Sequence, residues 1–323
     1  MTHSRPIPSA ARVRWGDGPV SRRSQLAAAG VVALMAALTG WARQVHSAAG
    51  EASSGSEAAR PMTGRAPAIF VGHGSPMNAI QSNRFTHALG QWGEALGKPK
   101  ALLVVSAHWL TERETQVSTT AQPPLIYDFG GFPRALFEVK YPAPGAPYAA
   151  RKASARLAPR RAGEDPKRGL DHGTWTVLRH LYPAAEVPVC QLSVDITRAG
   201  PHHVALGRAL ASLRDEGIMI VGSGNVVHNL RILDESLGET ERASTDWAQG
   251  FDAAAKQAMD ANDLNALAAW ERLAPGAAQA VPFPDHYFPL LYAAGAAQAS
   301  ERARHVFEGF QEGTLSMRCV QWG

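Results

Sequence analysis

The sequence predicts a single α/β domain with a central mixed or mostly parallel sheet flanked by helices. Two observations support this fold class. Short apolar runs, each of the length of a buried strand, recur along the chain, and longer segments with helical periodicity lie between them. Strands that alternate with helices are typical of a sheet with helices on both faces. No internal repeat and no clear second domain is found in residues 67–323.

The elements are expected in the following order. Four apolar runs should form the buried centre of the sheet, at 68–71, 101–105, 187–194 and 217–221. A short alternating strand is expected at 116–119, and closing strands at 306–307 and 315–320. Helical segments are expected at 84–96, 148–157, 174–181, 202–216, 247–260, 264–273 and 285–297.

Residues 123–147 form a long irregular segment that is rich in proline, glycine and aromatic residues, including Tyr127 and Phe129. It has little periodicity, yet it is too aromatic for a disordered linker. A segment of this kind inside a compact domain is often a substrate loop. We expect Tyr127 and Phe129 to stack on or wall a substrate.

Residues 1–48 have the layout of a twin-arginine-type export signal. Arg22 and Arg23 precede an apolar stretch at 26–42, and small residues follow at 47–49. We expect export to the periplasm, with contact to the membrane only through this signal. The alternative is an uncleaved membrane anchor, although about 17 apolar residues are at the short limit for spanning a bilayer. Residues 49–66 are expected to be a linker, and residues 67–323 the folded domain that carries the function.

The charge of the chain gives no support for a nucleic-acid partner. Residues 1–48 contain six arginines and one aspartate, a net charge of +5, and the whole chain carries +4, so the remainder carries about −1. Nothing after the signal therefore indicates a nucleic-acid surface. Cys190 and Cys319 are the two cysteines, and they either pair in an oxidising compartment or remain two buried thiols. The sequence does not indicate an oligomeric state.

Three histidines share a position in the predicted fold. His73, His108 and His228 each follow a predicted buried strand, in loops that contain Gly, Ser or Asn. Ligands of open α/β sheets bind at the carboxyl ends of the strands, so the three side chains are expected at one edge. Gly72 and Gly224, beside two of these histidines, would let the backbone approach a ligand closely.

The residue types point to a metal that prefers nitrogen. Imidazoles suit Zn, Fe, Cu and Ni, whereas Mg and Ca prefer oxygen. The chain has no HExxH motif, no P-loop, no GxGxxG and no GxSxG, so it lacks the usual signals of a thermolysin-like protease, a nucleotide-binding protein or a serine hydrolase.

His172 lies in a turn before a predicted helix, between Asp171 and Thr174. With a pKa near neutrality, a histidine there can pass protons to a metal-bound substrate. The alternative is an ordinary capping turn in which Asp171 or Thr174 acts.

Several longer strings carry a family resemblance. They are GHGSPMNAI (72–80), SAHW (106–109), DFGGFP (128–133), YPAPG (141–145), LDHGTW (170–175), EGIMIVGSGNVVHNL (216–230) and DHYFPLLYAAGA (285–296). Together they resemble the DOPA 4,5-dioxygenase-type extradiol dioxygenases of the class III, LigB-like enzymes. The strings occur in the family's order and cover about residues 67–323.

The resemblance implies cleavage of a catechol ring beside one hydroxyl, with insertion of both atoms of O2. It implies a mononuclear site with His73, His108, His228 and His286 as metal ligands, Fe(II) for activity and Zn(II) possible in the isolated protein. His172 would line the site as an acid/base group. Related LigB-like enzymes use two histidines and a glutamate as ligands. His228 is therefore a ligand, a second acid/base group, or a ligand only in the zinc-bound form. Asn225 and Ser75 are further candidates to orient substrate oxygens.

Two other functions use the same histidines. One is a zinc hydrolase in which Zn(II) activates water. The other is a non-catalytic protein that binds a metal or a phenolic ligand. Zinc is redox-inert, so the identity of the metal discriminates between these functions and a dioxygenase.

Overall fold

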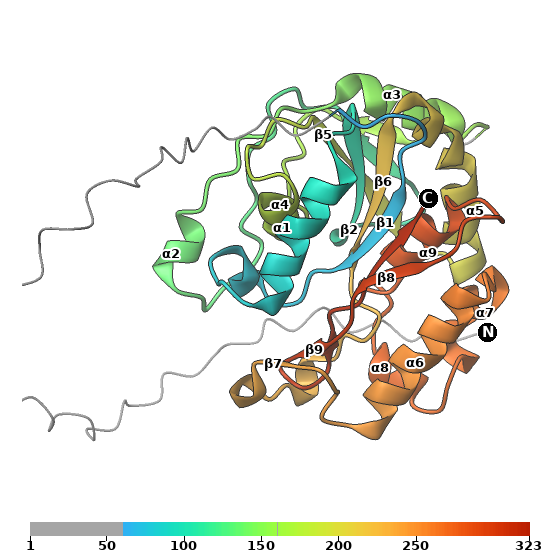
Figure 1. Cartoon of the computed structure of the whole chain (residues 1–323). Coiled ribbons are helices and arrows are strands. Elements are labelled where there is room, and N and C mark those ends of the chain that lie inside the picture. Colours follow the sequence, from blue (N-terminus) through green and yellow to red (C-terminus); the bar gives the residue numbers. More distant parts are fainter. Residues whose placement is uncertain (1–60, 160) are drawn as a thin grey trace, which may run out of the picture. The chain divides into compact units, whose positions relative to one another are not determined.

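The computed structural model describes residues 61–159 and 161–323, which belong to one compact unit (Figure 1). The export signal expected at 1–48 and residues 49–60 of the expected linker lie outside the described residues. Residues 61–66 are already docked onto the domain, since the Met62 and Ala66 amides donate to the carbonyls of Lys98 and Arg214. Within the described ranges, no helix combines the length and the apolar character needed to cross a membrane.

Eight strands of the described residues form the main sheet, in the order β4-β3-β5-β2-β6-β1-β11-β8. The central strands β5, β2, β6 and β1 are parallel, whereas β3 and β11 run antiparallel to β5 and β1. The predicted mixed, mostly parallel sheet is thereby confirmed. The strands are β1 (Ala68–Gly72), β2 (Ala101–Thr111), β3 (Gln116–Ser118), β4 (Gly163–Asp165), β5 (Val189–Asp195), β6 (Ile218–Gly224), β8 (Arg304–Phe307) and β11 (Cys319–Trp322).

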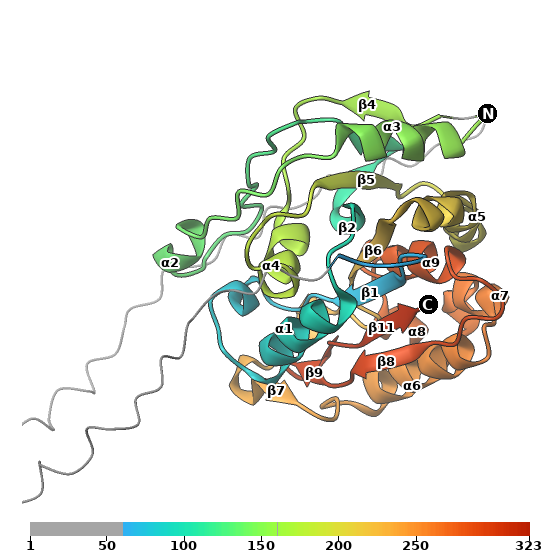
Figure 2. The same cartoon turned by 45° about the horizontal axis from the view of Figure 1, so that its top comes forward.

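Helices cover both faces of this sheet (Figure 2). Alternate residues of β1 point to opposite faces, so that Ile69 and Val71 pack with α1 and α4, and Phe70 packs in the core shared by α3, α5, α6 and α9. The helices are α1 (Arg84–Leu96), α2 (Arg134–Phe137), α3 (Pro147–Arg156), α4 (His172–Leu181), α5 (Gly200–Leu210), α6 (Asp246–Asp260), α7 (Leu264–Ala268), α8 (Ala277–Ala280) and α9 (Phe288–Gly295).

The last predicted strand is divided between two sheets. Residues 315–320 were expected to be continuous, but Leu315–Ser316 forms β10 and Cys319–Trp322 forms β11. β10 pairs with β9 (Phe310–Gln311), which pairs with β7 (Glu239–Thr240) in a small second sheet. The break occurs where Ser316 and Arg318 turn to bond Asp252 of α6.

Other boundaries differ by shorter stretches. The helix expected at 202–216 is α5 followed by a 3₁₀ segment, Ala211–Glu216, and α7 is followed by another, Trp270–Arg272. β2 continues six residues beyond the expected 101–105 run, with an irregularity between Val105 and Leu110.

Cys190 and Cys319 are both buried and unpaired in the structure. Burial raises the pKa of each thiol to about 12, so both remain neutral. The second of the two alternatives for the cysteines is therefore the one observed.

Candidate metal centre

Five histidines gather at the carboxyl edge of the parallel strands. His73 directly follows β1, His172 begins α4, and His286 precedes α9. His108 was expected just after a strand but lies inside β2, within the irregular stretch between Val105 and Leu110. His228 lies in the loop after β6. Chain segments that are far apart in sequence thus deliver imidazoles to one place.

Three of these rings are almost equidistant from one another. The ring centroids of His73, His108 and His286 are separated by 5.1, 4.9 and 5.1 Å. Three imidazoles whose nitrogens lie about 2.1 Å from one ion bring their ring centroids to roughly 5 Å from one another. The spacing of the three rings therefore fits a shared divalent metal.

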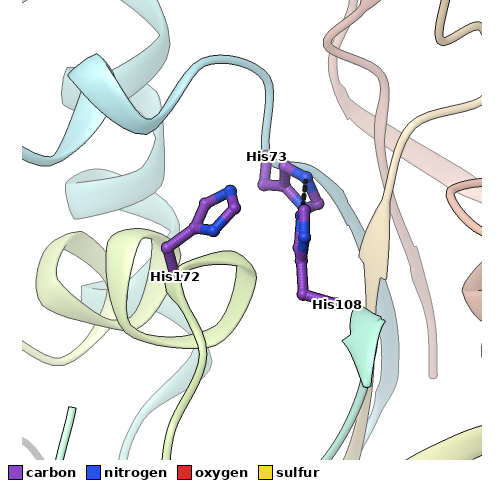
Figure 3. Close-up of side chains that lie close together, drawn as sticks. All are labelled: His73, His108 and His172. Carbon is purple, nitrogen blue, oxygen red and sulfur yellow. Dashed lines mark hydrogen bonds between the residues drawn. The ribbon is translucent and has the colours of Figure 1, made fainter. Parts of the chain in front are cut away.

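His73 is held in one orientation by a chain of two hydrogen bonds. The Ser223 hydroxyl, at the end of β6, donates to the Gly173 carbonyl at 2.6 Å. Its oxygen lies 3.0 Å from His73 Nδ1 and, with its hydrogen already committed, accepts from that nitrogen. His73 Nε2 is consequently left with a free lone pair and faces His108 Nε2 at 3.2 Å (Figure 3).

Asp128 contacts two histidines from the irregular segment 123–147. One oxygen accepts from the His172 backbone amide at 3.0 Å and lies 2.9 Å from His172 Nδ1. The other oxygen lies 3.5 Å from His108 Nδ1. Burial favours a higher pKa for Asp128, but the contacts with His172 and His108 outweigh it and lower the pKa to about 2.

A buried carboxylate supports the backbone beneath His108 and His172. Asp171 caps α4 by accepting from the Thr174 amide at 3.1 Å, so the capping role considered for this turn is real. The same carboxylate accepts from three further side chains, those of Ser106 (2.7 Å), Arg168 (2.9 Å) and Gln191 (2.6 Å). The Ser106 hydroxyl in turn accepts from the His108 amide at 3.2 Å. The capping turn and the imidazole at the site therefore coexist.

His228 lies against His286, outside the triangle of rings. The two rings are stacked, with centroids 3.5 Å apart and an interplanar angle of 5°. His228, His286 and Asp285 form a group of possible metal ligands whose ligand atoms lie within 4.8 Å of one another. Asp285 is within 3.0 Å of His286 Nδ1, but outside hydrogen-bonding geometry, so that this buried nitrogen has no hydrogen-bond partner among the described residues.

Burial keeps four of these imidazoles neutral, those of His73, His108, His228 and His286. Burial, reinforced by the neighbouring histidines, holds the pKa of His73 and of His286 well below the usual value of 6.5. Burial lowers the pKa of His108 and of His228 to about 4. Neutral imidazoles present lone pairs at physiological pH, and metal binding then needs no deprotonation.

The aromatic segment reaches the site through one ring. Phe129 meets His172 edge-on with centroids 5.4 Å apart, which fits the expectation that it walls a substrate. Tyr127 packs against Trp175, and its hydroxyl donates a hydrogen bond to the Val139 carbonyl at 2.7 Å.

The two weaker candidates each bond one backbone group, while the buried Asn225 Oδ1 has no hydrogen-bond partner among the described residues. The Asn225 amide donates to the Ser316 carbonyl at 2.8 Å, and the Ser75 hydroxyl accepts from the Met77 amide at 3.4 Å. Gly224 also has a different role from the one expected, because a Cβ there would lie 2.0 Å from the His286 carbonyl oxygen. The absence of a side chain at Gly224 lets the backbone at His286 pack closely against β6.

Sequence reasoning missed Asp128 and Ser223. Asp128 lies in the string DFGGFP (128–133) and Ser223 in EGIMIVGSGNVVHNL (216–230), which both carry the family resemblance. An aspartate or a serine in such a string does not by itself indicate a functional role. Their partners are 44 and 150 residues away in sequence. A search for hydrogen-bond partners of the five imidazoles would have been needed to select them.

The described residues fit a divalent metal. His73 and His108 place their Nε2 atoms 3.2 Å apart, and buried His286 Nδ1 lacks a hydrogen-bond partner among the described residues. His73, His108 and His172 also form a group whose ligand atoms lie within 4.8 Å of one another. An all-imidazole donor set suits Fe(II) or Zn(II) and not Mg(II) or Ca(II).

Comparison with known proteins identifies the family. Residues 66–315 match the LigB family, described as the catalytic LigB subunit of aromatic ring-opening dioxygenase. A protein of Escherichia coli K12 named 4,5-DOPA dioxygenase extradiol is 42% identical over 266 residues, which are 80% of this chain and 95% of the relative. A Beta vulgaris protein of the same name is 38% identical over 254 residues, 77% of this chain and 93% of its own length.

A solved structure shares the fold of this chain. The crystal structure of an uncharacterized protein from Escherichia coli K12 superposes with a TM-score of 0.69 at 38% sequence identity, over 80% of this chain and 100% of the other. The resemblance inferred from the sequence strings is thereby confirmed. The chain is a member of the LigB family of metal-dependent aromatic ring-opening dioxygenases.

Proposed function

We propose that the protein is an extradiol dioxygenase that opens a catechol ring, with DOPA or a related catechol as substrate. The observation that carries the proposal is the triangle of neutral imidazoles from His73, His108 and His286, with His172 and Phe129 beside it. The relatives named 4,5-DOPA dioxygenase extradiol support this substrate class.

The metal in the active enzyme is proposed to be Fe(II), held by His73, His108 and His286. When bound, Fe(II) supplies a redox-active centre at which a catechol and O2 are held next to each other. Zinc fits the same donors but is redox-inert, so a zinc-loaded protein would bind a catechol without opening its ring.

His172 is suited to move the proton of a catechol hydroxyl. Its Nδ1 faces Asp128, so that Nε2 is the nitrogen available to the substrate. The ring lies 3.9 Å from that of His108, centroid to centroid, and is therefore next to the metal site. A base in that position accepts a proton as the catechol binds and returns it as the ring opens. Phe129 would limit access of water on that side.

His228 has two possible tasks that one variant separates. It stacks on His286, so it is placed either to complete the ligand set or to exchange protons near it. Replacing His228 with Ala reduces metal content if it is a ligand, and reduces turnover at full metal content if it is an acid/base group.

The proposal is tested by anaerobic reconstitution. The metal-free protein is loaded with Fe(II) or, as a matched control, with Zn(II), and O2 uptake is recorded with a panel of catechols that includes DOPA. We expect O2 uptake and a yellow product with iron only. His172→Gln should keep its iron and lose turnover. Absence of O2 uptake with every catechol would favour a zinc hydrolase or a binding protein.

We also propose that the protein is periplasmic and exported by the twin-arginine route. The support is the sequence pattern of residues 21–49, with Arg22 and Arg23 before the apolar stretch. A fusion of residues 1–50 to a reporter should be exported, and Arg22→Lys with Arg23→Lys should block it. Unchanged export refutes the twin-arginine route, and a full-length product in the membrane indicates an uncleaved anchor.

A further inference from the structure

Asp128 connects the aromatic segment to the metal site. It lies between Tyr127 and Phe129, in the loop whose Phe129 ring contacts His172. One carboxylate oxygen serves both the backbone amide and Nδ1 of His172, at 3.0 and 2.9 Å. The second oxygen faces Nδ1 of His108 at 3.5 Å. One side chain therefore contacts two imidazoles from two different elements, β2 and α4.

The chemistry of the carboxylate determines which hydrogens these rings carry. An ionised carboxylate is only an acceptor, so the nitrogen that bonds it must be the donor. His172 therefore carries hydrogen on Nδ1, and in the neutral ring Nε2 keeps the lone pair. Because the same oxygen also binds the His172 backbone amide, the ring is fixed relative to the first turn of α4.

The effect on His108 is weaker but acts in the same direction. A separation of 3.5 Å is longer than a normal hydrogen bond, so the carboxylate acts on this nitrogen mainly by charge. It favours hydrogen on Nδ1 and a lone pair on Nε2. That Nε2 is the atom that faces His73 Nε2 at 3.2 Å.

We propose that Asp128 is a positioning residue that holds His172 and His108 as their Nδ1–H tautomers, so that both Nε2 atoms face the reaction site. The inference rests on the proposed function, in which His172 Nε2 accepts the substrate proton and His108 Nε2 binds metal. The same residue fixes the Phe129 loop against the site, so substrate contacts and proton transfer depend on one carboxylate.

The wild-type protein tests this without any turnover. Long-range ¹H–¹⁵N correlation spectra of the metal-free and zinc-loaded protein report which nitrogen of each histidine carries hydrogen. The His172 signals are assigned by their loss in His172→Gln. We expect hydrogen on Nδ1 of His172 in both samples. Hydrogen on Nε2 would overturn the proposal, whatever the activity.

Variants give the second test. In Asp128→Asn the side-chain amide can donate as well as accept, so we expect His172 to populate the Nε2–H tautomer. We expect kcat to fall about 10- to 100-fold, while KM changes less and iron content is kept. The control is Glu138→Gln, which removes a carboxylate from the same segment. Among the described residues, Glu138 pairs only with the exposed Arg134.

The outcomes distinguish a failure of the positioning role of Asp128 from a failure of the proposed dioxygenase function. If Asp128→Asn keeps wild-type kcat and the wild-type tautomer, Asp128 is not a positioning residue. If Asp128→Asn does not fold, as judged by its thermal melt, the wild-type spectra still decide. If iron-loaded wild-type protein opens no catechol, the proposed function fails, while the tautomer measurement on Asp128 remains valid.

Discussion

Replacement of Gly173 by Ala tests the geometry of the metal site by a purely steric change. Gly173 is the second residue of α4 and lies against the rings of His108 and His73. A Cβ at this position would lie 2.7 Å from His108 Cδ2, 2.8 Å from the Ser106 hydroxyl and 3.3 Å from His73 Cε1. The first two distances are shorter than real Cβ contacts, so a ring or the helix must shift.

The expected magnitude follows from the fixed surroundings. Ser106 is bonded to Asp171, and His108 is held from the other side by Asp128, so neither can move freely. Overpacking of this kind costs about 1–3 kcal/mol. If the rings yield, this corresponds to a loss of about 5- to 150-fold in metal affinity. If the helix yields, the metal-free protein loses the same free energy of unfolding.

The assay measures both quantities. Zinc affinity is determined by competition with a chelator, and the free energy of unfolding by urea titration of the metal-free protein. Gly90→Ala is the matched control, because Gly90 is also helical and its Cβ would meet nothing within 4 Å. That change should stabilise the protein by about 0.5–1 kcal/mol. If Gly173→Ala behaves like Gly90→Ala in both assays, the described arrangement of His73 and His108 is wrong.

Three further predictions concern other parts of the site and the core. Ser223→Ala removes the acceptor of His73 Nδ1–H, and zinc affinity should fall about tenfold or more in chelator competition; an unchanged affinity would exclude this bond as a support of the ligand. Phe129→Ala should raise KM for a catechol with little loss of bound iron, whereas an unchanged KM would place the substrate elsewhere. Burial lowers the pKa of His203 from 6.5 to about 4, so the native state keeps this ring neutral. Below pH 6.5 the unfolded state binds a proton that the native state does not, and the free energy of unfolding falls toward pH 4 by up to about 3 kcal/mol. Urea midpoints of the metal-free protein at pH 7 and pH 4.5 check this, and His203→Gln should reduce the difference.

The main sheet could be predicted because its strands are local apolar runs. The runs at 68–71, 101–105, 187–194 and 217–221 became β1, β2, β5 and β6, and hydrophobic burial alone is enough to select them. The end of the chain could not be predicted in the same way. Residues 315–320 are split because Arg318 bonds Asp252, a partner 66 residues away that no local pattern reveals.

The metal site was partly visible in the sequence for a similar reason. The strand-end positions of His73 and His228 follow from the order of strands, and the structure brings both to the same edge as His286. His108 lies within β2 because that strand continues past an irregularity, which composition does not show. Asp128 and Ser223 were missed because their contacts form only when distant segments meet.

The central claim is that this site opens an aromatic ring with O2, and isotope labelling tests it most directly. Iron-loaded protein is allowed to react with a catechol under ¹⁸O2, and the ring-opened product is analysed by mass spectrometry. The account predicts that both labelled oxygen atoms of one O2 molecule appear in the product, apart from exchange with water. A product that carries oxygen only from water, or an intact catechol, would contradict it.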